Sequence, residues 1–173
     1  MHTTDRIFLV GFMGSGKTTA GRKLASRLGW SFIDLDELIE RDNGMSVAKI
    51  FAERGEEWFR TVESNALREI GNNRNTVIST GGGTPCFFGN MEFMLKNGLT
   101  VYLKMTPEKL NRRLSRSTAG RPLLKNIGKK ELPGYISALL NERELWYSRA
   151  EITIEIERGN ISALLSLIKN RLG

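Results

Sequence analysis

Cysteine and histidine are almost absent from this sequence of 173 residues: each occurs once, as Cys86 and His2. One cysteine cannot form an internal disulfide, and there is no second histidine to activate it as a nucleophile. We therefore interpret Cys86 as a small packing residue and expect a reducing, cytoplasmic location.

Long apolar runs are missing as well. No stretch approaches the ~20 residues of a membrane span, and the short polar segment 1–6 does not resemble a signal peptide. No internal repeat is visible, and the length suits one domain with a full core. We expect a single domain over residues 1–173, no membrane partner and a monomer.

Acidic residues are fewer than basic ones, 19 against 26, which gives a formal net charge of +7 at pH 7. The basic residues do not form one block, and the densest group contains Arg112, Arg113, Arg116 and Arg121. Such a balance suits a nucleic-acid-binding protein, and equally a small enzyme that collects anionic substrates. We favour anionic small molecules and expect no nucleic-acid partner.

The most informative stretch is Gly11 to Thr18, which matches the phosphate-binding pattern G-x-x-x-x-G-K-[ST]. It lies between the apolar run Ile7 to Val10, a predicted strand, and a helical pattern over Thr19 to Leu28. Glycines let successive backbone N–H groups surround an anion, and the following helix adds its positive N-terminal end. Lys17 would reach the β- and γ-phosphates, and the Thr18 hydroxyl would bind Mg²⁺. A chance match in a glycine-rich turn is the alternative.

Two aspartates, Asp34 and Asp36, follow the predicted strand Trp30 to Ile33. Ligands of open α/β sheets bind beyond the carboxyl ends of the strands, so these aspartates should lie beside the phosphate loop. If the chain stays extended there, both face one side and share a site, one nearer the metal and one nearer the acceptor. The alternative is that Asp36 caps a helix over Glu37 to Arg41.

A helical pattern with breaks at Gly44 and Gly55 continues from Glu37 to Asn72. A crossover between two strands needs only one helix, so we expect the surplus to build an acceptor pocket. Arg60 and Glu63 share one helical face, either as a surface ion pair or with the arginine placed to hold a carboxylate.

The predicted strand Thr76 to Ser79 leads into three glycines, Gly81 to Gly83. Glycines at this edge let backbone N–H groups approach a ligand closely. The alternative is a flexible turn without a ligand. The strand lacks the terminal aspartate of a Walker B motif, which leaves Asp34 as the candidate carboxylate on the metal side.

The rest of the chain alternates between helical and extended patterns. Between them, Ser115 to Lys130 is rich in basic residues, glycine and proline, and we interpret it as a lid that closes over phosphates rather than as a solvated loop. Five strands alternating with helices predict a parallel sheet covered on both faces. The remaining predicted elements are helix Met91–Lys96, strand Leu99–Leu103, helix Pro107–Leu114, helix Glu131–Ala150, strand Ile152–Ile156 and helix Ile161–Leu172.

The order of these motifs resembles that of the shikimate kinases over nearly the whole chain. Besides the phosphate loop, the resemblance rests on Asp34-Leu35-Asp36, Gly55 to Glu63, the triple glycine, Gly120-Arg121-Pro122-Leu123-Leu124, and Arg143 with Tyr147. It implies a nucleoside monophosphate kinase-like fold with strand order 2-3-1-4-5, a substrate-binding insertion at about 35–72 and a lid at about 115–130. It also implies ATP-dependent, Mg²⁺-dependent phosphorylation of the shikimate 3-hydroxyl in aromatic amino-acid biosynthesis.

The resemblance further implies roles for individual residues. Arg60 and Arg143 would hold the shikimate carboxylate, while Asp36 would orient the attacking hydroxyl and accept its proton. Thr18 and Asp34 would serve Mg²⁺. The expected catalytic residues are Lys17, Asp36 and Arg121; the expected shikimate-binding residues are Asp36, Arg60, Gly82 and Arg143; the expected ATP-binding residues are Gly14, Ser15, Gly16, Lys17, Thr18, Thr19, Arg113 and Arg121. Adenine would lie between Arg112–Arg113 and the loop Arg158–Asn160, although Ile161 stands where the resemblance leads us to expect proline.

Three alternatives stay open. Another small-molecule kinase of this fold, for gluconate or a nucleotide, would share the phosphate loop, but paired arginines favour a compact carboxylate. A GTPase-type switch is disfavoured because the guanine signature Asn-Lys-x-Asp is missing. A nucleic-acid-stimulated ATPase would bind RNA or DNA with a steep salt dependence.

Overall fold

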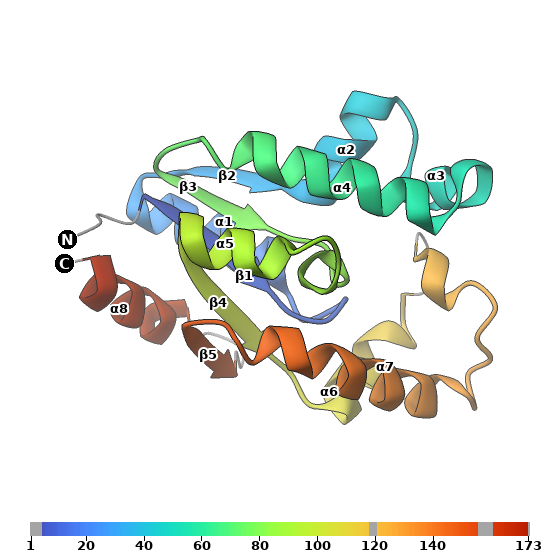
Figure 1. The fold of residues 1–173 in the computed structure, drawn as a ribbon. Helices are drawn as coiled ribbons and strands as arrows, with labels where there is room; N and C mark the ends of the chain where they lie inside the picture. Colours follow the sequence, from blue (N-terminus) through green and yellow to red (C-terminus); the bar gives the residue numbers. More distant parts are fainter. Residues whose placement is uncertain (1–4, 118–120, 156–160, 173) are drawn as a thin grey trace.

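The computed structural model describes residues 5–117, 121–155 and 161–172. Its strands form one parallel sheet in the order β2-β3-β1-β4-β5, as predicted, and helices cover it (Figure 1). The strands are β1 (Arg6–Val10), β2 (Ser31–Asp34), β3 (Thr76–Ser79), β4 (Leu99–Lys104) and β5 (Ile152–Glu155). The helices are α1 (Lys17–Leu28), α2 (Leu35–Asn43), α3 (Val47–Arg54), α4 (Glu56–Ile70), α5 (Asn90–Asn97), α6 (Pro107–Leu114), α7 (Leu132–Tyr147) and α8 (Ile161–Leu172), with short 3₁₀ turns η1 (Thr84–Cys86) and η2 (Pro122–Leu124).

The two faces of the central strand β1 pack into two separate cores. Successive strand residues point to opposite faces, so Ile7 and Leu9 pack against α1 and α8 on one side. Phe8 and Val10 pack on the other side, against α4, α5, α6 and α7. All four side chains are fully buried, which is why the sequence shows a continuous apolar run.

The predicted helical region Glu37–Asn72 divides into α2, α3 and α4 because two glycines stop the helices. Gly44 ends α2 in the left-handed conformation at φ 64°, and Gly55, at φ 84°, separates α3 from α4. α2 begins at Leu35, two residues earlier than predicted, because the Asp34 side chain caps it. The C-terminal end of α7 also differs from the prediction, because the helix ends at Tyr147 rather than at Ala150.

The register of the strands brings the predicted motifs to one edge of the sheet. Leu9 of β1 and Asp34 of β2 both pair with Ser79 at the end of β3. The phosphate loop after β1, the aspartates at the end of β2 and the glycines after β3 therefore emerge side by side. In the part of the chain that the structure describes, no helix is long and apolar enough to cross a membrane.

Candidate active site

The phosphate loop connects β1 to α1 through glycines that have positive φ angles. Gly14 and Gly16 lie at φ 79° and 92°, where a side chain would be strained. The Lys17 ammonium is buried within the loop and donates to the carbonyl oxygens of Gly11 (2.7 Å) and Phe12 (3.0 Å). Burial lowers the pKa of Lys17 to about 8, although the Asp36 and Asp34 carboxylates oppose this shift. The loop thus places a cation at the positive end of α1.

Asp34 connects the end of β2 to the phosphate loop. Its Oδ2 atom accepts a hydrogen bond of 2.6 Å from the Thr18 hydroxyl, while its Oδ1 accepts from the backbone N–H groups of Asp36 (3.1 Å) and Glu37 (3.2 Å). Asp34 is therefore the N-cap of α2. The alternative that Asp36 caps this helix is wrong, and so is the premise that both aspartates lie on extended chain, because Asp36 is in the first helical turn.

The Thr18–Asp34 pair suits magnesium. Both side chains offer oxygen ligands, which Mg²⁺ prefers, and Mg²⁺ in nucleotide sites keeps waters and phosphates as most of its ligands. Among the described residues no group of three or more His, Cys, Asp or Glu side chains could hold a metal.

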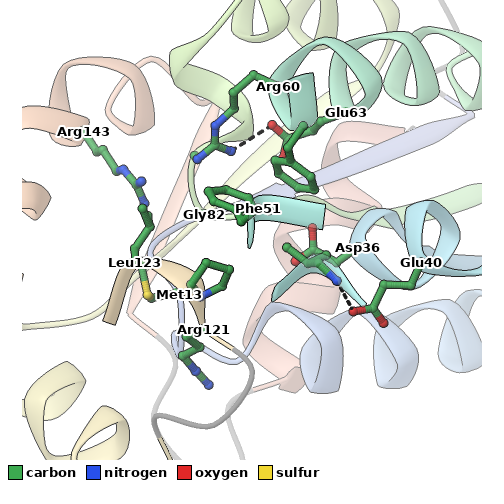
Figure 2. A pocket seen from close by; sticks show the side chains of 15 residues that line it. Met13, Asp36, Glu40, Phe51, Arg60, Glu63, Gly82, Arg121, Leu123 and Arg143 are labelled. Carbon is green, nitrogen blue, oxygen red and sulfur yellow. Dashed lines mark hydrogen bonds and ion pairs between the residues drawn. The ribbon is translucent and has the colours of Figure 1, made fainter. Parts of the chain in front are cut away.

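Two cavities meet at this edge of the sheet. A cleft of about 680 Å³ runs along the phosphate loop, and a pocket of about 160 Å³ lies beside it. The cleft is lined by Met13, Gly14, Gly16, Lys17, Thr18, Thr19, Asp34, Asp36, Glu37, Glu40, Ser79, Thr80, Gly81, Gly82 and Arg121. The pocket (Figure 2) is lined by Met13, Asp36, Glu40, Val47, Phe51, Phe59, Arg60, Glu63, Gly81, Gly82, Gly83, Arg121, Pro122, Leu123 and Arg143. Six residues border both cavities, so a ligand in one can reach a ligand in the other.

Asp36 is one of two carboxylates that border both cavities, and Glu40 is the other. It is partly exposed, at the start of α2. Its pKa is raised to about 7, first by burial and then by the nearby carboxylates of Glu63 and Asp34, with Lys17 acting in the opposite direction. A carboxylate that titrates near neutrality suits proton transfer at physiological pH.

Arg60 enters the pocket from α4 and is almost completely buried. Its Nη1 donates to Glu63 Oε2 at 3.0 Å, and its Nε and Nη2 donate to Glu56. The Arg60–Glu63 ion pair exists, but both side chains are at most 5% exposed, so the alternative of a surface pair is wrong. The ring of Phe87 lies 4.5 Å from the guanidinium carbon, a cation–π contact that no sequence motif indicated.

Arg143 enters from α7 and is also buried. Its guanidinium lies 5.6 Å from the centre of the Phe12 ring, and its buried Nη1 has no hydrogen-bond partner among the described residues. A buried donor without a partner is costly. An anionic group bound in the pocket would satisfy it.

Glycine is needed in the triple-glycine segment because neighbouring atoms leave too little room for a Cβ atom, and not because the backbone has positive φ angles. A Cβ on Gly83 would lie 2.5 Å from Arg60 Nη2, one on Gly82 would lie 3.0 Å from the Met13 nitrogen, and one on Gly81 would lie 2.7 Å from Glu63 Oε1. The segment is packed between α4 and α7, the helices that carry the two arginines, which argues against a flexible turn.

The other predicted site residues lie near the cleft in different ways. Thr19 lines it, and Arg121, which is half-buried, borders both cavities. Arg113 does not line it, but its Nη1 donates to the Gly14 carbonyl at 3.1 Å. Ser15 does not line it either, and its hydroxyl is buried without a partner among the described residues. Gly120 and the loop Arg158–Asn160 lie outside the described residues.

Sequence reasoning missed several side chains of the pocket. Phe51 of α3 belongs to no recognisable motif, and Met13 occupies a variable position of the phosphate-loop pattern, yet both line the pocket. Glu40 lines both cavities, and its Oε1 accepts from the Val47 backbone N–H at 2.8 Å, which ties α2 to the start of α3. The break between those helices at Gly44 was the only available signal that Glu40 and Val47 could meet.

Known proteins resemble this chain over most of its length. A family model described as shikimate kinase matches residues 13–172. A shikimate kinase of Parabacteroides distasonis is 50% identical over 153 residues, 88% of either chain. The solved shikimate kinase of Bacteroides thetaiotaomicron has a TM-score of 0.87 at 42% identity and covers 96% of this chain and 97% of its own. The shikimate kinase of Acinetobacter baumannii, solved in complex with shikimate, has a TM-score of 0.88 at 37% identity, covering 98% and 93%. This chain belongs to the shikimate kinase family.

Proposed function

We propose that this protein transfers the γ-phosphoryl group of ATP to the 3-hydroxyl of shikimate, in aromatic amino-acid biosynthesis. The observation that carries the proposal is the position of Asp36. It borders both the cleft of the phosphate loop and the pocket that contains Arg60 and Arg143. A shikimate kinase at 50% identity and a shikimate-bound structure of a relative support the choice of acceptor.

The two arginines suit the acid group of shikimate. The buried Nη1 of Arg143 has no partner among the described residues, and Arg60 is fixed by Glu63 and by aromatic rings. Charge-assisted hydrogen bonds from guanidinium groups recognise carboxylates with defined geometry. With the carboxylate held at this end, the hydroxyls of a compact ring extend toward Asp36 and the cleft.

Phosphoryl transfer depends on positioning and charge stabilisation more than on covalent help. Amides of the phosphate loop and Lys17 hold the phosphates, and Arg121 approaches them from the segment after α6. Thr18 and Asp34 would hold Mg²⁺, and the ion would supply positive charge to neutralise the transferring phosphate group. Asp36 orients the attacking hydroxyl and accepts its proton.

The predicted regional roles stay proposals. The insertion at about 35–72 corresponds to α2, α3 and α4, which contribute Asp36, Glu40, Phe51 and Arg60 to the pocket. The lid at about 115–130 includes η2, whose Pro122 and Leu123 line the pocket beside Arg121. We propose that this segment closes over both substrates. The single domain, the monomeric state, the cytoplasmic location and the absence of a nucleic-acid partner remain predictions.

The test is a coupled assay of ADP release by the purified protein with ATP and Mg²⁺, with shikimate, gluconate or a nucleoside monophosphate as acceptor. The proposal expects fast release only with shikimate, and a product heavier by one phosphoryl group in mass spectrometry. Good activity with gluconate or a nucleotide and none with shikimate would refute it. ADP release that RNA or DNA stimulates without shikimate would favour the ATPase alternative.

A further inference from the structure

The triple-glycine segment is attached to the protein on two sides. On one side, the Thr84 hydroxyl donates to Glu63 Oε1 of α4 at 2.5 Å, and the Asn90 side-chain amide donates to the Thr84 carbonyl at 2.9 Å. On the other side, the Tyr147 hydroxyl of α7 donates to the Gly82 carbonyl oxygen. The segment therefore connects the helices that carry Arg60 and Arg143, and Figure 2 shows these two side chains entering the pocket from different helices.

The attachment through Tyr147 is closely defined. Tyr147 is fully buried and lies four residues after Arg143, one helical turn further along α7. Its ring packs on Tyr102, with ring centres 5.1 Å apart. Burial raises the pKa of the Tyr147 hydroxyl, so it remains protonated and donates at neutral pH. A rigid ring therefore holds the Gly82 carbonyl at a fixed position relative to Arg143.

The contacts of the glycines show what this attachment controls. A Cβ on Gly82 would lie 3.2 Å from Arg143 Nη1, and one on Gly83 would lie 2.5 Å from Arg60 Nη2. The backbone of the segment thus fills the space beside both guanidinium groups. A shift of the segment would change the position of both donors.

We propose that Tyr147 is a positioning residue for the acceptor: by holding the Gly82 carbonyl, it fixes the triple-glycine segment as a spacer between Arg60 and Arg143. Tyr147 does not line the pocket or the cleft. It therefore acts through the segment, and through Arg143, with which its hydroxyl also interacts, rather than by touching a substrate. This inference rests on the proposed function, because it takes shikimate as the ligand of the two arginines.

The test compares Tyr147→Phe with Tyr102→Phe. Both changes remove one hydroxyl from the same pair of packed rings. The Tyr102 hydroxyl, however, donates to Glu144 Oε2 (2.7 Å), which also pairs with Lys104. Tyr147→Phe should raise the KM for shikimate about tenfold, the size expected from the loss of one hydrogen bond. Its KM for ATP and its kcat should stay within about twofold, and Tyr102→Phe should leave all three within about twofold.

A shikimate KM that is unchanged in Tyr147→Phe would overturn the inference. Equal rises in both KM values, or an equal effect of Tyr102→Phe, would also overturn it, because these results indicate general loosening of the ring pair. Should Tyr147→Phe fail to fold, Thr84→Val tests the attachment on the α4 side, and it should likewise raise the KM for shikimate alone. A wild-type protein inactive with shikimate refutes the proposed function, whereas an active wild type with an unaltered Tyr147→Phe variant refutes only this inference.

Discussion

Replacing Asp36 by asparagine should make the protein more stable at alkaline pH while it removes most of the activity. The folded protein raises the pKa of this carboxyl from 3.8 to about 7, mainly by burial. Above pH 7 the carboxylate is ionised in the folded and unfolded states, and its ionisation costs the folded state free energy. Asparagine has nearly the same shape and carries no charge, so the variant avoids that cost.

The size of the effect follows from the pKa difference. A change from 3.8 to about 7 corresponds to about 4 kcal/mol in the free energy of unfolding. Asp36 is partly exposed to the cleft, and solvent screening there reduces the expected gain to about 2 kcal/mol. Because the folded-state pKa is the higher one, the wild type loses this stability as the pH rises from about 4 through 7. The advantage of the variant should therefore be full at pH 8 and shrink toward pH 4.

The assay is urea unfolding of the nucleotide-free proteins at pH 8 and at pH 5, together with steady-state kinetics. Asp36→Asn should lower kcat by about 100-fold or more if Asp36 accepts the proton. Asp42→Asn is a suitable control, since Asp42 is exposed on the same helix and pairs only with Arg41 in the described contacts; we expect changes within about 0.5 kcal/mol. An Asp36→Asn variant that is less stable than the wild type at pH 8, or a difference independent of pH, would refute the reasoning.

Three further predictions concern the same site. Lys17→Ala should lower kcat by about 100-fold or more, because the phosphates lose the positive charge of the Lys17 ammonium. The thermal midpoint should change little, and near-normal turnover would contradict this role. Arg60→Ala should raise the KM for shikimate far more than that for ATP, and it should destabilise the fold by about 3–5 kcal/mol because Glu63 is left buried without its partner. Arg60→Ala combined with Glu63→Gln should recover part of that stability, and equal effects on both KM values would count against the carboxylate role. Finally, kcat/KM for shikimate should rise with pH through about 7 as Asp36 ionises, and a flat profile between pH 6 and 8 would argue against a proton acceptor.

The sequence was sufficient to predict the parallel sheet and the edge of the sheet at which the site lies. The apolar run of β1 and the glycine pattern of the phosphate loop are local signals, and each depends on a few neighbouring residues. Helix boundaries were less certain, because Asp34 turned out to cap α2 through its side chain, and only the three-dimensional course of the chain reveals which of two nearby aspartates does so.

The pocket depended on contacts between residues far apart in the chain, which periodicity cannot reveal. Arg60 and Glu63 are three residues apart, so their pairing was predictable, but their burial results from packing under the segment that follows β3. Phe87 and Arg60, which are in contact, are 27 positions apart in the chain, and Tyr147 and Gly82, which share a hydrogen bond, are 65 positions apart. Both follow from the tertiary fold alone.

The central claim is that the two cavities hold the two substrates of one reaction. A crystal structure with shikimate and a non-hydrolysable ATP analogue tests it most directly. The account predicts the shikimate carboxylate at Arg60 and Arg143, and one ring hydroxyl beside Asp36 at about 3–3.5 Å from the terminal phosphorus. Shikimate bound elsewhere, or with every hydroxyl turned away from the nucleotide, would contradict the account.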